Sequence, residues 1–286
     1  MLETRSRAAS LRGLWRRSVG SARLAVLSQF EYRFNLIADT VIQPVLTAVV
    51  EVALWWALFW SIGTAAGLAA GEATLGGFGR DYYLSYALWA AFFSRIYASW
   101  MYEFRMTEEI DTGAVNSILV RPLGFYEYYL AQFMAYKVMT AAITLSVWLV
   151  FTQFFDSQTI FSRLPLALAL AFFHLFLVHT ISFCIASCAF FYNRVHSFTV
   201  AKNISLWMLS GELFPLDLMP EPLRSILINL PFACGVYVPV GYVTGRFGAE
   251  RVWSGFLSIA IGLVVFGLLA SVLWNAGRRR YTGQGA

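Results

Sequence analysis

Charged side chains are scarce in this sequence. Only 13% of its 286 residues are aspartate, glutamate, lysine or arginine, whereas 59% are hydrophobic. Soluble domains carry about a quarter of their residues as charged side chains, so this composition excludes an ordinary soluble protein and predicts a polytopic membrane protein. The formal net charge is +5. We attribute it to the placement of arginines on either side of a membrane and expect no nucleic-acid partner.

Cysteine and histidine are also few, which limits the chemistry available. Cys184, Cys188 and Cys234 form neither a metal-binding spacing nor the even set that a disulfide framework needs. His174 and His179 lie five residues apart, so on a helix their side chains point about 140° away from each other. We therefore expect no metal site, and we expect both histidines to be packed inside the membrane.

Two further motifs are missing. The sequence contains no Gly-x-x-x-x-Gly-Lys-Ser/Thr loop, so it has no phosphate-binding loop for ATP. No Ser/His/Asp arrangement stands out, and arginines interrupt the segment from Met1 to Arg23 where a signal peptide would need an apolar core. We expect no catalytic residue and no cofactor bound by this chain.

What is present is a series of long apolar runs. Each has roughly the 20 residues needed to cross a bilayer as a helix. The predicted spans are residues 36–60, 82–102, 128–155, 164–191, 198–214 and 252–274. Residues 10–34 carry apolar side chains at helical spacing with arginines between them, which predicts an amphipathic helix in the membrane interface; a disordered basic tail is the alternative. The expected fold is a single all-α transmembrane domain over residues 1–286.

The basic residues predict the orientation of these spans. With the N-terminus inside, most of them lie on the cytoplasmic side, where arginine and lysine are enriched in membrane proteins. These cytoplasmic residues are Arg5, Arg7, Arg12, Arg16, Arg17, Arg23, Arg33, Arg105, Arg121, Arg194, Lys202 and Arg278 to Arg280. The opposite side holds Arg80, Arg163, Arg224, Arg246 and Arg251. Both termini are therefore expected in the cytoplasm.

The stretch from Ser210 to Phe232 is apolar but too rich in proline and charge to be an ordinary span. Proline breaks a helix because it lacks an N–H, and irregular backbone is not tolerated against lipid. We predict a re-entrant hairpin over residues 215–233 that opens to the outside, with a second short helix from Glu221 to Leu230 whose apolar face is Leu223, Ile226, Leu227 and Leu230. The candidate residues of this outer gate are Gly211, Glu212, Phe214, Pro215, Asp217, Pro220 and Pro222.

A polar segment, residues 103–127, follows the second span on the cytoplasmic side. Thr107 can cap a short helix there, with Glu108 and Glu109 in the first turn, where the helix dipole favours acids. Gly113 interrupts this helix, Pro122 ends it, and Val115, Ile118 and Leu119 form an apolar face. The pattern predicts an exposed docking helix; a helix that only lies on the membrane is the alternative.

The first three predicted spans contain four charged residues, namely Asp39, Glu51, Arg95 and Lys137. A charge in hydrocarbon is costly and usually faces the interior of the bundle. Asp39 can pair with Arg95 or with Lys137. Glu51 has no obvious partner, so Glu51 and Arg95 are candidate pathway residues; structural pairing, snorkelling of Arg95 or a neutral Glu51 are the alternatives.

In their order along the chain, these features resemble a membrane subunit of a bacterial type 2 ABC transporter. The resemblance covers nearly the whole chain. It lies in the interfacial helix, the six spans and four segments: Ile-Asp-Thr-Gly-Ala-Val-Asn-Ser-Ile-Leu-Val-Arg-Pro (110–122), Gly-x-x-Phe-Pro-Leu-x-x-Met-Pro-x-Pro-Leu-Arg (211–224), Leu-Pro-Phe (230–232) and the basic tail 273–285.

The resemblance implies a partner and a mechanism. A separate ABC ATPase subunit, present as a dimer, would bind ATP and Mg and dock on the segment after the second span. The docking residues it implies are Thr107, Glu108, Glu109, Ile110, Asp111, Gly113, Asn116, Leu119, Arg121 and Pro122. Two permeases, identical or merely similar, would form the pathway at their interface in the bacterial cytoplasmic (inner) membrane, in contact with its lipids.

The resemblance also favours export, and the many intramembrane aromatic residues suit a hydrophobic, lipid-like or drug-like substrate. Two other functions stay open from the sequence. One is an integral-membrane transferase that acts on a lipid-linked substrate, for which His174, His179 and Asp156 are the available groups. The other is a non-transporting membrane anchor in an ATPase-driven machine.

Overall fold

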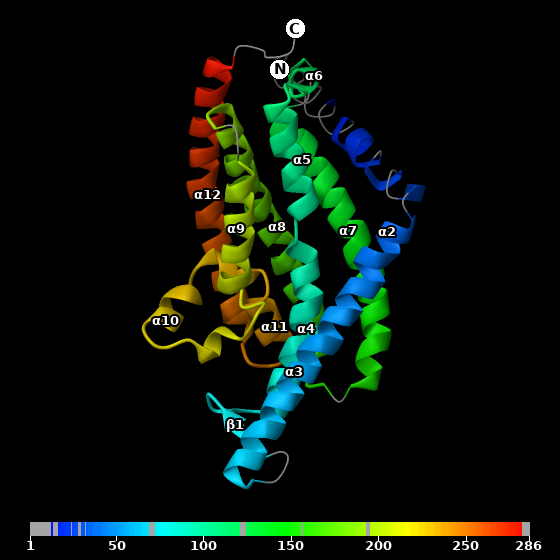
Figure 1. The fold of residues 1–286 in the computed structure, drawn as a ribbon, viewed down its shortest axis with the longest axis vertical. Coiled ribbons are helices and arrows are strands. Elements are labelled where there is room, and N and C mark those ends of the chain that lie inside the picture. Colours follow the sequence, from blue (N-terminus) through cyan, green and yellow to red (C-terminus); the bar gives the residue numbers. More distant parts are fainter. Residues whose placement is uncertain are drawn as a thin grey trace, which may run out of the picture.

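The protein is an elongated bundle of helices (Figure 1). The computed structural model describes residues 13, 17–23, 25–27, 30–31, 33–68, 72–120, 124–155, 157–192 and 195–281. Ten of the 25 residues of the predicted interfacial helix 10–34 lie outside these ranges, and its described residues between 17 and 31 are helical. The all-α architecture expected from the sequence is confirmed, with one two-stranded hairpin in the described part of the chain.

The first long helix is continuous from Arg33 to Ala66 and consists of α2 (Arg33–Ile37), the π-helical turn η1 (Ala38–Ile42) and α3 (Gln43–Ala66). Pro44 lies directly after the π turn. Because proline has no N–H, the carbonyl of Thr40 loses its donor four residues on. The hydroxyl of Thr144 on the neighbouring helix α7 donates to this carbonyl at 3.0 Å instead.

The glycine- and alanine-rich segment after the first span is more ordered than a flexible loop. Helix α3 continues through it to Ala66 and ends at Gly67, whose φ of +64° is a left-handed conformation that glycine adopts readily. The strands β1 (Thr74–Leu75) and β2 (Phe78–Gly79) then form a short antiparallel hairpin. Thr74 pairs with Gly79 and Leu75 pairs with Phe78.

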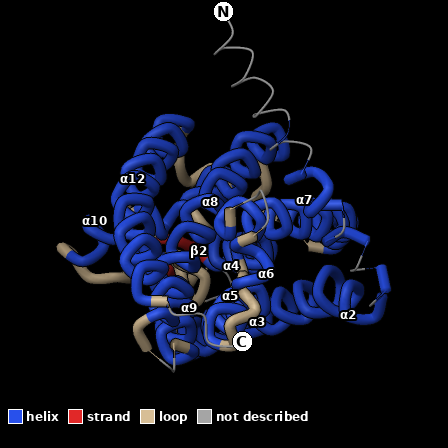
Figure 2. Tube along the Cα trace, turned by 90° about the horizontal axis from the view of Figure 1, so that it is seen from above, coloured by secondary structure: helices blue, strands red, loops and turns tan. Residues whose placement is uncertain are grey.

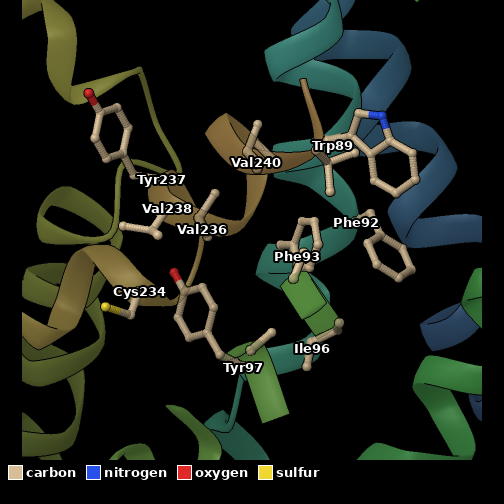
Figure 3. Packing of buried hydrophobic residues seen from close by; sticks show 14 of the residues in the cluster. Trp89, Phe92, Phe93, Ile96, Tyr97, Cys234, Val236, Tyr237, Val238 and Val240 are labelled. Carbon is tan, nitrogen blue, oxygen red and sulfur yellow. The ribbon is translucent and has the colours of Figure 1, made fainter. Parts of the chain in front are cut away.

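The second predicted span, 82–102, is broken into two helices. Helix α4 (Arg80–Tyr97) ends where Ala98 turns extended, and α5 (Trp100–Asp111) begins after Ser99. Nearly every residue of α4 is buried, because α3, α7, α8 and α11 all pack on it. In Figure 3 its aromatic residues Trp89, Phe92 and Phe93 lie beside Val236 and Val240 of the α11 region, which makes α4 the centre of the core.

Three long helices surround this centre (Figure 2). They are α7 (Phe125–Phe151), α8 (Leu164–Ser187) and α12 (Ala249–Arg280); the 3-10 turns η2 (Thr152–Phe154) and η3 (Phe161–Arg163) precede α8, and η4 (Cys188–Phe190) extends it. Helix α12 packs chiefly along α8. Gly255 and Gly262 face that contact, where a Cβ at Gly262 would approach Leu177 to 3.2 Å. Small residues let membrane helices pack closely in this way.

The fifth predicted span, 198–214, is shorter than expected. Helix α9 runs from His196 to Leu209 and is followed by irregular chain. That chain contains η5 (Leu216–Leu218), α10 (Leu223–Leu227) and η6 (Pro231–Cys234) before α11 (Tyr237–Val243). The predicted second helix from Glu221 to Leu230 is thus only five residues long, and it begins directly after Pro222.

Four helical stretches of the described chain are long and apolar enough to cross a membrane: Arg33–Ala66, Phe125–Phe154, Phe161–Phe190 and Ala249–Arg280. Helices α4 and α9 do not meet this description. The short helix α6 (Asn116–Leu119) and the C-terminal end of α12 lie at one end of the bundle, and the β1–β2 hairpin lies at the other (Figure 1).

Candidate functional site

The polar segment after α5 forms a protrusion at the α6 end of the molecule (Figure 1). Helix α5 ends at Asp111, and the chain then turns into α6 through Gly113, which has a φ of +78°. Val115 and Ile118 are almost fully buried, and together with Ile110 they pack into a second hydrophobic cluster beneath the protrusion. The polar side of the turn is left exposed.

The described docking residues divide between the surface and the interior of this end of the molecule. Glu108, Asp111 and Asn116 are exposed, and Leu119 is 40% exposed. Glu109 is half-buried and pairs with Arg105 at 3.5 Å. Arg121 and Pro122 lie outside the described residues.

Thr107 does not cap a helix. It lies inside α5, is 6% exposed, and its hydroxyl donates to the carbonyl of Glu103 at 3.1 Å. The prediction was wrong because α5 begins at Trp100 and runs straight through Thr107, so this position has no exposed helix N-terminus to cap.

The hairpin region is anchored by one buried carboxylate. Asp217 accepts hydrogen bonds from the hydroxyls of Tyr82 at 3.0 Å and Tyr237 at 2.9 Å, and from the guanidinium of Arg246 at 3.0 Å. Partial burial acts to lower the pKa of Arg246, but the hydrogen bond and charge of Asp217 outweigh it, so the pKa is raised. Asp217 thereby joins η5 to α4, to α11 and to the loop before α12.

A second set of contacts holds the turn that follows α9. The carbonyl of Gly211 accepts a hydrogen bond from Tyr86 at 2.6 Å, and the carboxylate of Glu212 accepts one from Tyr97. Tyr97 also lies 3.2 Å from the hydroxyl of Ser210. Both tyrosines belong to α4, so the central helix holds the start of the hairpin.

The remaining predicted gate residues divide between the core and the surface. Pro215 is buried and Phe214 is half-buried, whereas Pro220 and Pro222 are exposed. The predicted apolar face of the second helix is not turned inward as a unit. Leu227 is buried, but Leu223 and Ile226 are 44% and 57% exposed.

The intramembrane charges include the pair expected from the sequence. Arg95 bridges to Asp39 at 3.0 Å, and Tyr136 donates to the same carboxylate at 2.6 Å. Lys137, which is 2% exposed, donates to the carbonyl of Arg95 at 3.1 Å. These groups link the first helix, α4 and α7 through polar contacts inside the bundle.

Glu51 has no ion-pair or hydrogen-bond partner in the described part of the chain. It is half-buried on α3, and its carboxylate interacts electrostatically with that of Glu212. The structure therefore brings together a predicted pathway residue and a predicted gate residue, both of them acidic.

Sequence reasoning missed a charged pair at the junction of α5, α8 and α9. Lys202 was counted among cytoplasmic cations, yet its side chain is 7% exposed and bridges to Glu103, whose side chain is 3% exposed. A sequence signal existed, because Lys202 falls inside the predicted span 198–214. An ionisable residue on a membrane-embedded helix implies an interior partner.

The histidines occupy separate packing positions on α8. The ring of His179 contacts the hydroxyl of Tyr102 and the carbonyl of Tyr126 through its two nitrogens. His174 is buried against Tyr97, and neither of its ring nitrogens has a hydrogen-bond partner. Asp156 lies outside the described residues, and no metal-binding group of three His, Cys, Asp or Glu residues occurs among the residues described.

A bundle of apolar helices with buried ion pairs, a polar protrusion at one end and a proline-broken hairpin is a multi-pass membrane domain. The sequence matches the family described as "ABC-2 family transporter protein" over residues 45–285, and the chain belongs to that family. It is accordingly a permease-type membrane subunit of an ABC transporter, which implies association with an ABC ATPase. A comparison of the sequence with curated proteins gives no match.

Proposed function

We propose that two permease subunits, two copies of this chain or this chain and a similar one, form the pathway of an ATP-driven exporter for a hydrophobic, lipid-like or drug-like substrate. ATP and Mg would bind to the partner ATPase dimer, and this chain would perform no catalysis itself. The observation that carries the proposal is the α5–α6 protrusion. The chain belongs to a transporter family, and Val115 and Ile118 of the protrusion are buried within the chain itself.

The protrusion suits docking better than lying on the membrane. A helix that lies in the interface turns its apolar face to the lipid, but Val115 and Ile118 are buried within the protein. The exposed residues Glu108, Asp111 and Asn116 face outward at the end of the bundle. Leu119 and Val120 are exposed beside them, by 40% and 84%. A surface of mixed polar and apolar residues of this kind fits a soluble partner subunit.

The hairpin fits a lid at the opposite, outer side of the pathway. Its backbone is irregular, so it must be covered by protein or water rather than lipid. Asp217 and Glu212 attach it to α4 through hydrogen bonds, and Leu216, Leu227 and Phe232 pack in or against the hydrophobic core. In this proposal six segments cross or enter the inner membrane, both termini are cytoplasmic, and residues 215–233 re-enter from outside.

Glu51 supports a pathway between subunits. Only 11% of the most apolar window of the first long helix is buried within this chain. A carboxylate on such a surface is costly if it faces hydrocarbon. A second permease subunit, or an aqueous path that the two subunits enclose, would place Glu51 and Glu212 in a polar environment beside the substrate.

Co-purification with the partner ATPase tests the proposal. Asn116→Arg, at the exposed protrusion, should abolish most of the recovery of the ATPase and its hydrolysis, whereas Asp81→Arg at the other end should not. Glu51→Gln should keep the ATPase bound but lower ATP-driven transport of a lipophilic dye into inverted vesicles. Full ATPase recovery with Asn116→Arg would overturn the docking site, and unchanged dye transport would remove Glu51 from the pathway.

A further inference from the structure

The carboxylate of Glu103 is the most heavily bonded charged group in the described interior. It is 2% exposed and bridges to Lys202 of α9. Ser99 donates to its Oε1 at 2.6 Å, Ser182 of α8 donates to the same oxygen, and Asn203 of α9 donates to its Oε2 at 2.9 Å. We call these five residues the Glu103 network.

The network is unusual for a site that only holds helices together. Replacing a buried ion pair by packed apolar residues is often neutral or stabilising, whereas removing one partner leaves an unpaired buried charge. Both the ammonium group of Lys202 and the carboxylate of Glu103 depend on α5 and α9 staying in register. The network is therefore sensitive to relative movement of these two helices in a way that an apolar contact is not.

The Glu103 network lies between the two regions of the proposed mechanism, the docking protrusion and the hairpin. Helix α5 runs from Glu103 to the protrusion at Asp111, about 12 Å away at ~1.5 Å per residue. Helix α9 runs from Lys202 toward the turn at Gly211, about 13 Å away by the same rise. The docking surface and the hairpin thus lie on opposite sides of one charged contact.

The central helix is interrupted at the same level. The chain between α4 and α5 is non-helical at Ala98 and Ser99, and the hydroxyl of Ser99 belongs to the network. On the α5 side of this break, Glu103 bonds to α9. On the α4 side, Tyr97 contacts Ser210 and Glu212, which directly follow α9. A rotation of α5 against α4 would pull on α9 through the Glu103 network and the stacked rings of Phe104 and His196, and would leave the contacts of Tyr97 in place.

We propose that the Glu103 network is the coupling between the ATPase-docking protrusion and the hairpin, with Glu103 and Lys202 as positioning residues that pass movement of α5 to α9. The inference rests on the proposed function of these two regions. It goes beyond that function because it assigns the transmission to one polar contact rather than to the bundle as a whole.

The test follows the hairpin directly and needs no known substrate. A cysteine at Ile226, which is 57% exposed on α10, reports on the hairpin through its rate of reaction with a maleimide. The complex of the chain with its ATPase is studied in lipid nanodiscs, with and without ATP and vanadate. Reaction of the chain without the added cysteine is subtracted.

Glu103→Gln keeps the size of the side chain but removes its charge. We expect it to retain the ATPase and its hydrolysis, while the ATP-dependent change in labelling rate falls about tenfold, a typical size for coupling between sites. The charge swap Glu103→Lys with Lys202→Glu should restore at least half of the change. Asp81→Asn, an exposed acid at the other end, is the control and should leave it intact.

Each outcome decides a different point. If Glu103→Gln responds like the unsubstituted chain, or if the swap restores nothing, the network only supports the fold and the inference falls. If Glu103→Gln fails to assemble, Asn203→Ala, which removes one hydrogen bond, decides instead, with an expected fall of about fourfold. No response in the unsubstituted complex would overturn the lid proposal together with the inference.

Discussion

At Gly211 the backbone turns from α9 into the hairpin with a φ of +81°. A Cβ there would lie 2.8 Å from the hydroxyl oxygen of Tyr86 and 3.0 Å from Cβ of Tyr237. Both the conformation and the lack of space therefore require glycine. Gly67 at the end of α3 has a similar φ of +64°, but a Cβ there would meet nothing within 4 Å.

These two glycines allow a matched comparison. Gly67→Ala should cost only the backbone term, about 1 kcal/mol. Gly211→Ala should cost about 2 kcal/mol more, because Tyr86 and Tyr237 must also shift. Thermal unfolding of the purified chain in detergent measures the difference, and equal melting temperatures for the two variants would contradict the close packing at Gly211.

For the charged residues, the sequence predicts that burying the charge in the membrane costs free energy, but it does not always predict which residue pairs with that charge. Asp39 could pair with Arg95 or with Lys137, and the structure shows the pair with Arg95. Glu103 and Lys202 are separated by about 100 positions, and both lie near predicted span ends, where a charge can reach water. Their burial follows from the break at Ala98 and the early start of α9, which only the tertiary structure shows.

At the scale of elements, the irregularity of the first long helix depends on its neighbour. Pro44 deprives the carbonyl of Thr40 of its ordinary donor, and Thr144 of α7 replaces it. Proline breaks are tolerated in membrane helices when another group satisfies the freed carbonyl. A proline in the sequence marks such a place, but the compensating residue lies 104 positions from Thr40.

A double-mutant cycle tests this compensation. Thr144→Val keeps the shape and removes the donor, which should cost about 1 kcal/mol, or about 2–4 °C in Tm. In the Pro44→Ala background the alanine N–H can donate to Thr40 within the helix, so the same change should cost less than half as much. Additive effects in detergent-solubilised protein would show that the two sites are independent.

At the scale of the whole molecule, the proposed orientation places α6 and the C-terminal end of α12 in the cytoplasm and the hairpin outside. The arginines Arg278, Arg279 and Arg280 at the end of α12 lie at the same end as the protrusion (Figure 1). Basic residues are enriched on the cytoplasmic side of membrane proteins, so the position of these arginines agrees with a cytoplasmic position of the proposed docking surface.

Labelling with a membrane-impermeant maleimide tests the orientation. Glu221→Cys, at an exposed position of the hairpin, should react in intact spheroplasts. Asn116→Cys, in the protrusion, should react only after the membrane is opened, and the chain without an added cysteine gives the background. Reaction of Asn116→Cys in intact spheroplasts would reverse the topology.

The sequence by itself determined that this is an all-α membrane protein of the ABC-2 family, because apolar runs of span length and the order of its polar segments are local features of the chain. It also located the proposed docking segment and the proline-rich stretch that we propose as a hairpin, since glycine, proline and charge act where they occur. Their anchoring was decided by the tertiary structure: which tyrosines hold Asp217 and Glu212, where α4 breaks from α5, and that Glu103 meets Lys202. Those contacts join residues far apart in sequence, and only the packing of helices around α4 brings them within hydrogen-bond distance. The stretch from Ser210 to Phe232 is thus recognisable from its prolines, but it is held in place by α4.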